Sequence, residues 1–210
     1  TQSAPDRWLK CITASGGVRA VAIQATRLVQ DAVKLHRLEG KSAQLFGEAL
    51  LGALTLASNT KPGERINLNI QGTGPFRQAL VDAYPDGRVR GYVVRREKMY
   101  PPSRKDEGPW GEGLLGVLKT QDAEGQQPYI GTIPLVTGHL AKDLTFYWHQ
   151  SEQINSAVGI SVKMGKGKNS KIVESAGAFI VQALPNCPGD ELAMIDDQVH
   201  HFSDYVKDLF

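Results

Sequence analysis

The residue types best suited to chemistry in this chain are its two cysteines, Cys11 and Cys187, which lie near opposite ends. No Cys-x-Cys or Cys-x-x-Cys pair occurs, so the spacing that holds zinc or builds a disulfide framework is missing. Cys11 stands in an apolar run and is predicted to be an inert packed thiol. Cys187 stands in a Pro-Gly turn and is predicted to be more exposed and more easily oxidised. This usage predicts no metal, no cofactor and a reducing, cytoplasmic location.

Two glycine-rich runs and a pair of histidines resemble phosphate, nucleotide or metal sites, but their spacing and the elements expected around them do not fit such sites. Residues 165–170 lack the Gly-x-x-x-x-Gly-Lys spacing of a phosphate loop, and a strand is expected after them, which favours a solvated hairpin tip. Residues 72–75 lack the third glycine of a dinucleotide fingerprint. His200 and His201 would point about 100° apart on a helix and so cannot share a metal. No Gly-x-Ser-x-Gly elbow is present, so no catalytic residue is predicted. An enzyme of unknown chemistry, with its cleft beside the turn at Gln153, is kept as a further alternative.

A basic stretch from Arg88 to Lys98 suggests a different class of function. Strands that bind single-stranded nucleic acid interleave cations with aromatic residues in this way. Strand alternation would also place Arg88, Arg90 and Tyr92 on one polar face of any half-exposed sheet. With 24 basic against 22 acidic residues, the net charge of +2 gives no general attraction to nucleic acid or to a membrane. A nucleic-acid-binding module is therefore the alternative interpretation, carried by Arg88, Arg90, Tyr92, Arg95, Arg96, Lys98 and Tyr100.

The composition is that of an ordinary globular protein. The 210 residues are 41% hydrophobic and 22% charged, which suffices for one substantial core. The first residues lack the basic and apolar parts of a secretory signal. No apolar run approaches the roughly 18 residues of a membrane span, so no membrane partner is expected. Because the chain does not begin with Met, a removed organelle presequence stays open.

Hydrophobic periodicity predicts an α+β fold, with a mixed, largely antiparallel sheet, helices packed on it and a C-terminal linker helix. One helix should run from Thr26 until Gly40 stops it. A second, from Ser42 to about Ala57, has so little polar surface that it should be the most buried helix. Residues 97–113, rich in Gly and Pro, should form an ordered surface loop. Strands are predicted at residues 8–13, 18–23, 64–70, 76–83, 88–94, 114–120, 127–135, 157–164 and 171–184.

The helix predicted at residues 138–150 organises the rest of the domain. Leu140, Leu144 and Trp148 recur every four residues and give this helix one apolar stripe, so Trp148 should be buried against the sheet. Thr137 is the predicted N-cap, because its oxygen can accept an orphan amide of the first turn.

The character of the sequence changes after Leu184. A breaker cluster of Pro and Gly is followed by apolar residues at steps of three and four, which predicts a narrow helical stripe. The chain is thus divided into a core domain, residues 1–185, and a linker-helix region, residues 186–210. That region ends on apolar residues without a cap, as in a truncated chain. A helix packed on its own domain is the plainer explanation of the stripe, which consists of Leu192, Ile195, Val199, Phe202, Val206 and Leu209.

Several short motifs follow one another in a fixed order along the chain. Each alone would recur by chance, but together they cover roughly residues 8–185 and resemble the redox-regulated chaperone family of bacteria, the 33 kDa chaperonin or heat shock protein 33. The motifs are Gly72-Thr73-Gly74-Pro75, Asp82-Ala83, residues 87–93, residues 113–117, residues 128–138, Ser151-Glu152-Gln153, Val158-Gly159 and residues 175–185.

The resemblance implies an ATP-independent holdase, not an enzyme, which binds unfolding proteins under oxidative or heat stress and is active as an oxidised homodimer. The stripe from Leu192 to Leu209 would then be the client-binding surface. Members of that family carry a C-terminal zinc module of four cysteines, Cys-x-Cys and Cys-x-x-Cys, whose oxidation releases the zinc. Those cysteines are absent from these 210 residues, so redox control is not assigned to them.

The lack of clustered thiolates and of spaced histidines predicts that the purified chain carries no stoichiometric zinc. Elemental analysis of the dialysed protein should find far less than one zinc ion per chain. One tightly held ion per chain would contradict this interpretation of the motifs.

Overall fold

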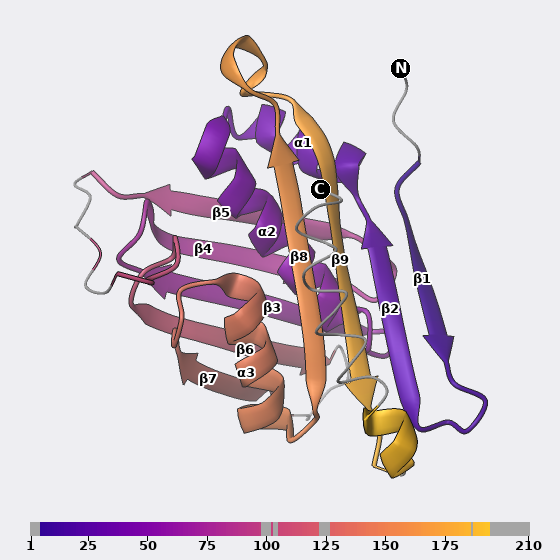
Figure 1. Cartoon of the computed structure of the whole chain (residues 1–210). Helices are drawn as coiled ribbons and strands as arrows, with labels where there is room; N and C mark the ends of the chain where they lie inside the picture. The colour runs from indigo at the N-terminus through magenta and orange to yellow at the C-terminus, as the bar shows by residue number, and fades with distance from the viewer. Residues whose placement is uncertain (1–4, 98–101, 103–104, 122–126, 186, 194–210) are drawn as a thin grey trace.

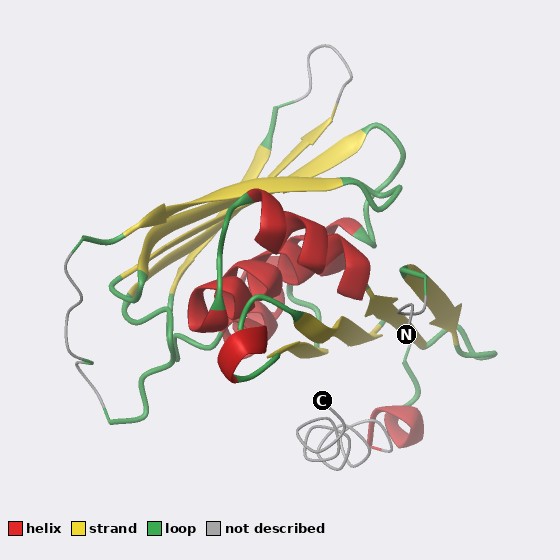
Figure 2. Cartoon of the chain, turned by 90° about the horizontal axis from the view of Figure 1, so that it is seen from above, coloured by secondary structure: helices red, strands yellow, loops and turns green. Residues whose placement is uncertain are grey.

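The computed structural model describes residues 5–97, 102, 105–121, 127–185 and 187–193. The predicted α+β class is confirmed. The strands do not form one mixed sheet, however. They divide into two sheets, and the helices lie between them (Figure 1, Figure 2).

The larger sheet consists of β3 (Glu64–Gly72), β4 (Phe76–Ala83), β5 (Val89–Arg95), β6 (Gly113–Gln121) and β7 (Tyr129–Pro134). Its order is β5-β4-β3-β6-β7, and every neighbouring pair is antiparallel. On β3 the side chains of Ile66, Leu68 and Ile70 are buried, as the alternation of the sequence predicts.

The smaller sheet consists of β1 (Arg7–Ile12), β2 (Val18–Gln24), β8 (Ser156–Met164) and β9 (Val173–Ala183). Its order is β1-β2-β9-β8, again with antiparallel neighbours only. The parallel pairs of a mixed sheet are therefore absent from the described strands. The first and last strands of the core are brought into the same sheet.

The layer between the sheets is built from α1 (Thr26–Leu35), α2 (Gly40–Ala57) and α3 (Leu140–Glu152) (Figure 2). Helix α2 packs against strands of both sheets, and most of its residues are buried, as predicted. Two glycines allow the close packing. A Cβ at Gly47 would lie 2.6 Å from Val29 Cγ1, and one at Gly52 would lie 3.1 Å from Leu144 Cδ1. No described helix is long and apolar enough to cross a membrane.

Helix α1 ends through a left-handed residue that is not glycine. Arg37 has a φ of 51°. Its N–H donates to Lys34 O at 3.1 Å, and the N–H of Leu38 donates to Val33 O at 3.0 Å, which are the paired bonds of a Schellman motif. The buried Leu38 side chain packs in the core and holds this turn in place. Gly40, predicted to stop α1, is instead the first residue of α2.

Helix α3 begins at Leu140, and the prediction that Thr137 is its N-cap is wrong. The N-cap is His139, which makes no side-chain capping bond. The buried Asp143 reaches back instead. Its Oδ1 accepts from the N–H groups of Val136 at 3.1 Å and Thr137 at 2.8 Å, and from the Thr137 hydroxyl at 3.1 Å. A carboxylate inside the helix therefore fixes the entry to α3.

A buried amide ties the smaller sheet to the end of α2. Gln182 Oε1 accepts from Arg19 Nε at 2.8 Å and from Asn59 Nδ2 at 2.9 Å, and Gln182 Nε2 donates to Ser156 Oγ at 2.9 Å. This network joins β2, β8, β9 and the residues after α2. Because Gln182 is fully buried, removing a partner would leave a polar atom unsatisfied.

The segment predicted as a surface loop at residues 97–113 places one side chain in the core. Trp110 is fully buried, with its ring centroid 6.0 Å from that of Phe76. The backbone N–H of Trp110 donates to Gly138 O at 3.0 Å, and its backbone carbonyl accepts from Gly74 N at 3.0 Å. The loop is thus attached both to the larger sheet and to the turn before α3.

The burial of Trp148 confirms its predicted place against the core, since 2% of it is exposed. Trp148→Ala should lower the free energy of unfolding by about 3 to 5 kcal/mol, because the cavity left behind adds to the lost transfer energy. Urea denaturation would measure this. His149→Ala, at an exposed position of the same helix, should change stability by less than about 0.5 kcal/mol. Equal midpoints for the two variants would contradict the packing of α3.

Candidate functional site

The predicted apolar stripe begins in the described part of the chain and continues beyond it. Residues 189–193 are helical, and the N–H of Leu192 donates to Pro188 O at 3.0 Å. The Leu192 side chain is half-buried. The stripe as a whole stays a prediction, because its other members lie outside the described residues; they are Ile195, Val199, Phe202, Val206 and Leu209.

The start of the linker helix is fastened to the tip of the β1–β2 hairpin, a contact we name the hairpin–linker junction. Glu191 Oε2 accepts from Ser15 Oγ at 2.8 Å and from Thr13 Oγ1 at 3.3 Å. Ser15 Oγ itself accepts from Gly17 N at 3.0 Å, which closes the hairpin turn. The Glu191 carboxylate therefore binds a turn that the Ser15 hydroxyl already holds in shape. Directly after β9, Leu184 N donates to Gly17 O at 2.8 Å. The junction consists of Thr13, Ser15, Gly17, Cys187, Pro188 and Glu191.

Gly17 is needed in the junction because the linker approaches it closely. Its backbone conformation does not require glycine, because its φ is not in the left-handed region. A Cβ at Gly17 would lie 2.7 Å from Pro188 Cδ and 2.9 Å from Cys187 Cα. Both distances are shorter than real carbon contacts, so a larger residue must displace the start of the linker. At Gly189, in the same segment, an added Cβ would meet nothing within 4 Å.

The predicted environments of the two cysteines are both wrong. Cys11 is exposed, because β1 lies at the edge of its sheet, and its thiol points to Ala20 O at 3.7 Å. Cys187 is half-buried in the junction. Partial burial, with the carboxylates of Glu191 and Asp190, raises the pKa of the Cys187 thiol. Cys187 is therefore less readily ionised, and less reactive, than its Pro-Gly context suggested.

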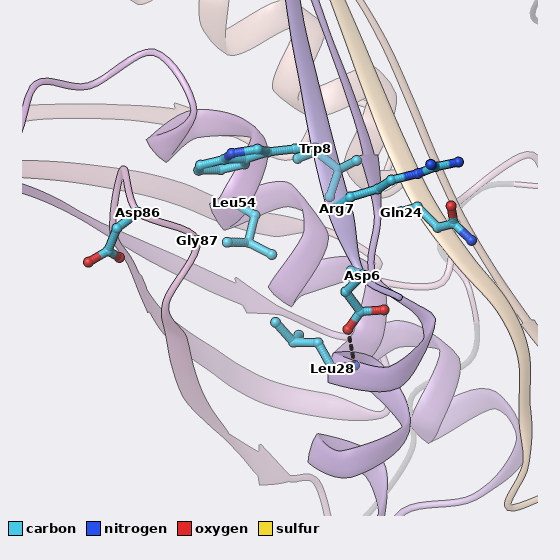
Figure 3. A pocket seen from close by; sticks show the side chains of 10 residues that line it. Asp6, Arg7, Trp8, Gln24, Leu28, Leu54, Asp86 and Gly87 are labelled. Carbon is cyan, nitrogen blue, oxygen red and sulfur yellow. Dashed lines mark hydrogen bonds between the residues drawn. The ribbon is translucent and has the colours of Figure 1, made fainter. Parts of the chain in front are cut away.

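A pocket of about 270 Å³ opens beside the start of β1, between the smaller sheet, the helices α1 and α2 and the β4–β5 turn (Figure 3). Trp8 lines one side of the pocket, and Leu28 and Leu54 line the other. At its edge, the two Asp6 carboxylate oxygens accept from the N–H groups of Arg27 at 3.0 Å and Leu28 at 2.7 Å. Asp6 thus caps α1, whose own N-cap residue makes no side-chain bond, and holds the start of β1 against that helix.

The basic stretch forms β5 and alternates as predicted, with Arg90 and Tyr92 exposed. Two of its arginines have carboxylate partners close by. Arg90 pairs with Asp82 at 3.0 Å and Arg88 with Asp86 at 2.8 Å. These pairs reduce the positive potential available to a phosphate backbone, so the structure adds no support to the nucleic-acid alternative. Two members of the stretch lie outside the described residues, namely Lys98 and Tyr100.

The cleft predicted beside Gln153 is a polar pocket of about 480 Å³ between the larger sheet and the end of α3. Glu152 lines it and accepts from the Tyr147 hydroxyl at 3.3 Å. Burial, and then the Glu152 carboxylate, raise the pKa of Tyr147 far above its ordinary value, and burial also raises the pKa of Glu152. A phenol held protonated in this way cannot act as a nucleophile near neutral pH. This geometry gives the enzyme alternative no support.

Both glycine-rich runs connect two strands. Residues 73–75 join β3 to β4, and the run at residues 165–170 joins β8 to β9. A phosphate loop instead opens an α-helix, whose N-terminus binds the anion. The second run is also docked on the helical layer, because Gly40 N donates to Ser170 O at 2.9 Å. Among the described residues, no group of three or more His, Cys, Asp or Glu is placed to hold a metal ion.

Sequence reasoning missed the residues that build the junction and the cap of α1. Glu191 and Asp6 act on turns far from them in the chain, so no local pattern indicates their partners. The only signal was the small-residue turn that contains Ser15 and Gly17, and it indicated a hairpin rather than a docking place.

Comparison with known proteins places this two-sheet core and its attached linker in a family. The model of the Hsp33 protein family matches residues 6–210. The chain belongs to the Hsp33 family of chaperones. Like its relatives, this Hsp33-family chain therefore has a chaperone role.

Three Hsp33 relatives show how much of a family member this chain represents. The 33 kDa chaperonin of Acaryochloris marina is 34% identical over 208 residues, which are 96% of this chain and 68% of the relative. That of Rippkaea orientalis is 36% identical over 209 residues, 96% of this chain and 67% of the relative. The crystal structure of the 33 kDa chaperonin from Thermotoga maritima matches with a TM-score of 0.79 and 29% identity, over 92% of this chain and 66% of that one. The chain thus spans about two thirds of their length.

The close approach at Gly17 predicts that Gly17→Ala detaches the start of the linker. In a Cys11→Ser background, alkylation of Cys187 should then become several-fold faster, because the thiol gains exposure and its raised pKa relaxes. The rate of iodoacetamide modification would measure this. Gly189→Ala adds a methyl group to the same segment without a clash and should leave the rate unchanged. Equal rates for the two variants would show that the junction adapts in place.

Proposed function

We propose that this chain is an ATP-independent holdase, which keeps partly unfolded proteins from aggregating by binding their apolar segments. Membership of the Hsp33 family is the observation that carries the proposal. Independence of ATP is supported by the two glycine-rich runs, which lie between strands and do not open an α-helix as a phosphate loop does.

The client surface that we propose is the linker stripe that begins at Leu192. Holding a client requires apolar surface that can be uncovered, and a narrow amphipathic stripe on a short attachment fits this need. The junction supports this by its chemistry. Its fastening is one carboxylate and two hydroxyls at a partly exposed site, which contributes far less than a packed core. The linker is thus held at its base by contacts that can break without unfolding the core.

Redox control, homodimer formation and a cytoplasmic location are proposals that rest on the family resemblance alone. The zinc module that the resemblance implies does not fit the described residues, since none of them form a metal-ligating cluster. Oxidative activation would therefore require cysteines that these 210 residues lack. Sedimentation analysis at micromolar concentration would test the homodimer.

Suppression of light scattering by a thermally unfolding client enzyme tests the holdase and its surface. The reduced and the peroxide-treated chain should suppress scattering equally, with or without ATP, because no zinc thiolates are present to respond. Val199→Asp with Phe202→Asp should abolish suppression by placing two charges on the stripe. Gln198→Asp with His201→Asp adds the same two aspartates beside the stripe and should retain it.

Two results would count against the proposal. A reduced wild-type chain that suppresses no scattering would remove the holdase function from this part of the protein. Full suppression by the Val199→Asp, Phe202→Asp double variant would leave the function and remove the stripe as its surface.

A further inference from the structure

The strand β1 is an edge of the smaller sheet, and it is unusually open for an edge. Five of its six residues are exposed, among them Leu9 at 66% and Ile12 at 62%. Proteins normally blunt such an edge with prolines, outward charges, bulges or a covering helix, because its unpaired N–H and C=O groups can pair with another chain. β1 contains no proline, and its six-residue pairing with β2 has no bulge.

The one lysine of β1 does not guard the edge. Lys10 Nζ donates to Ser58 O at 2.6 Å, and its ammonium lies 4.6 Å from the centre of the Trp8 ring. Both contacts turn the charge inward, toward the helical layer. The other described edges are better protected. β5 carries exposed arginines and pairs with a bulged β4, β7 ends in a proline, and β8 packs against α3.

The direction of the free backbone groups follows from the hairpin closure. Thr13 N donates to Val18 O at 2.8 Å, so the backbone of Thr13 points toward β2. Orientation alternates along a strand, and therefore Cys11 and Leu9 also bond to β2. The N–H and C=O groups of Trp8, Lys10 and Ile12 then point away from the sheet. Among the described residues these groups have no backbone partner, and they form a row along the free edge.

Both ends of this row are fixed before any partner arrives. Asp6 holds one end through its bonds to the N-terminus of α1, and the hairpin–linker junction holds the other through Thr13 and Ser15. An edge held in this way loses little conformational entropy on pairing. The pocket walled by Trp8 lies beside the row, so it can receive a side chain of an added strand (Figure 3).

The charge at this edge selects its occupant. β1 contains no acidic residue, and Arg7 is its outward cation, since the Lys10 ammonium is turned toward Ser58 O. Within the described part of the chain, Arg7 has no carboxylate partner, and the neighbouring Asp6 carboxylate is used by the N–H groups of α1. The edge therefore complements an extended segment that is apolar and carries carboxylates.

We propose that β1 is a template onto which an extended apolar, acidic segment of a partly unfolded protein adds as a further antiparallel strand. Main-chain bonds supply affinity that depends little on client sequence, and the Trp8 pocket accepts one large side chain. The inference deepens the proposed holdase function and rests on it. It adds a second client site, made by the core rather than by the linker stripe.

Amide hydrogen exchange at β1 tests the pairing directly. The probe is reduced, carboxymethylated α-lactalbumin, which stays unfolded. At saturating probe, exchange of the Trp8, Lys10 and Ile12 amides should slow by at least about tenfold, while the already bonded Leu9 amide changes little. Two synthetic peptides with one apolar core, flanked by Asp or by Lys, test the charge. The acidic peptide should bind at least about threefold more tightly at low salt, and added salt should narrow the difference.

The matched pair Ile12→Pro and Ile12→Thr separates backbone pairing from apolar contact. Proline removes the outward N–H without touching a bond to β2, whereas threonine keeps the N–H and removes apolar surface. Client affinity should fall about tenfold further in the proline variant, equivalent to about 1.4 kcal/mol. Should circular dichroism show that Ile12→Pro is unfolded, Leu9→Glu against Leu9→Gln supplies a second pair, in which the added carboxylate should weaken binding of the acidic segment further.

Unchanged exchange at saturating client, or equal affinity of both matched variants, overturns the proposal. Protection that rises with protein concentration in the absence of client would make the occupant a second copy of this chain, and also overturns it. These failures can be told apart from failure of the holdase function. If only the β1 template is wrong, the chain still suppresses light scattering by the client; if the holdase function is wrong, it does not. Protection of the three amides together with the proline-specific loss establishes the template.

Discussion

Burial of α2 on two opposite sides is the constraint on which the rest of this structure depends. A helix with so little polar surface cannot lie on one sheet with its other side in water, because exposing that side would forfeit about 25 cal/mol for each Å². The chain supplies two sheets for it. Gly47 and Gly52 let Val29 and Leu144 approach the helix more closely than any side chain would permit. The β–α–β layering of Figure 2 follows from this one element.

Two separate sheets have a cost, because each keeps its own edges. A closed barrel has none, whereas this fold exposes β1 and β8 on one sheet and β5 and β7 on the other. Single polar side chains add ties at the ends of the smaller sheet. Asp6 bonds to α1, Gln182 bonds to Asn59 after α2, and Glu191 bonds the linker to the hairpin tip. These ties are local, so the periphery can loosen while the core around α2 stays packed.

Most strands and the buried helix could be predicted from the sequence, because period and burial are local signals. The alternation of Ile66, Leu68 and Ile70 needs no knowledge of the partner strands. The division into two sheets could not be predicted in this way, since a pattern of buried faces does not say which strands pair. Arg37 shows a second limit. Tertiary packing of Leu38 overrode the glycine preference of a helix end, so the first available glycine was the wrong stop.

The same limit applied at the candidate site. Cys11 stands in an apolar run and would be packed in a central strand, but it lies on an edge, and sheet order is not written in local periodicity. Trp110 stands in a Gly- and Pro-rich segment, yet it is in the core. Thr137 has the right type for an N-cap, but its oxygen accepts from the N–H of His139, which precedes the helix, and its own N–H and hydroxyl donate to Asp143. In each case, the deciding contact is made by residues outside the local pattern on which the prediction rested.

The position of the hairpin–linker junction gives the proposed client surfaces a physical connection. Thr13 and Ser15 close the turn that ends β1, and they also bind Glu191 at the start of the linker helix. A strand added along β1 would stiffen this turn and so favour the docked linker, whereas release of the linker would leave the end of β1 freer. The linker is either docked on the hairpin or released from it. A client that binds one surface more tightly in one of these two states shifts the equilibrium between them, by no more than its difference in binding free energy for the two states. The small energy of one carboxylate and two hydroxyls sets the scale of that coupling, which suits a surface that must take up and release many different partners.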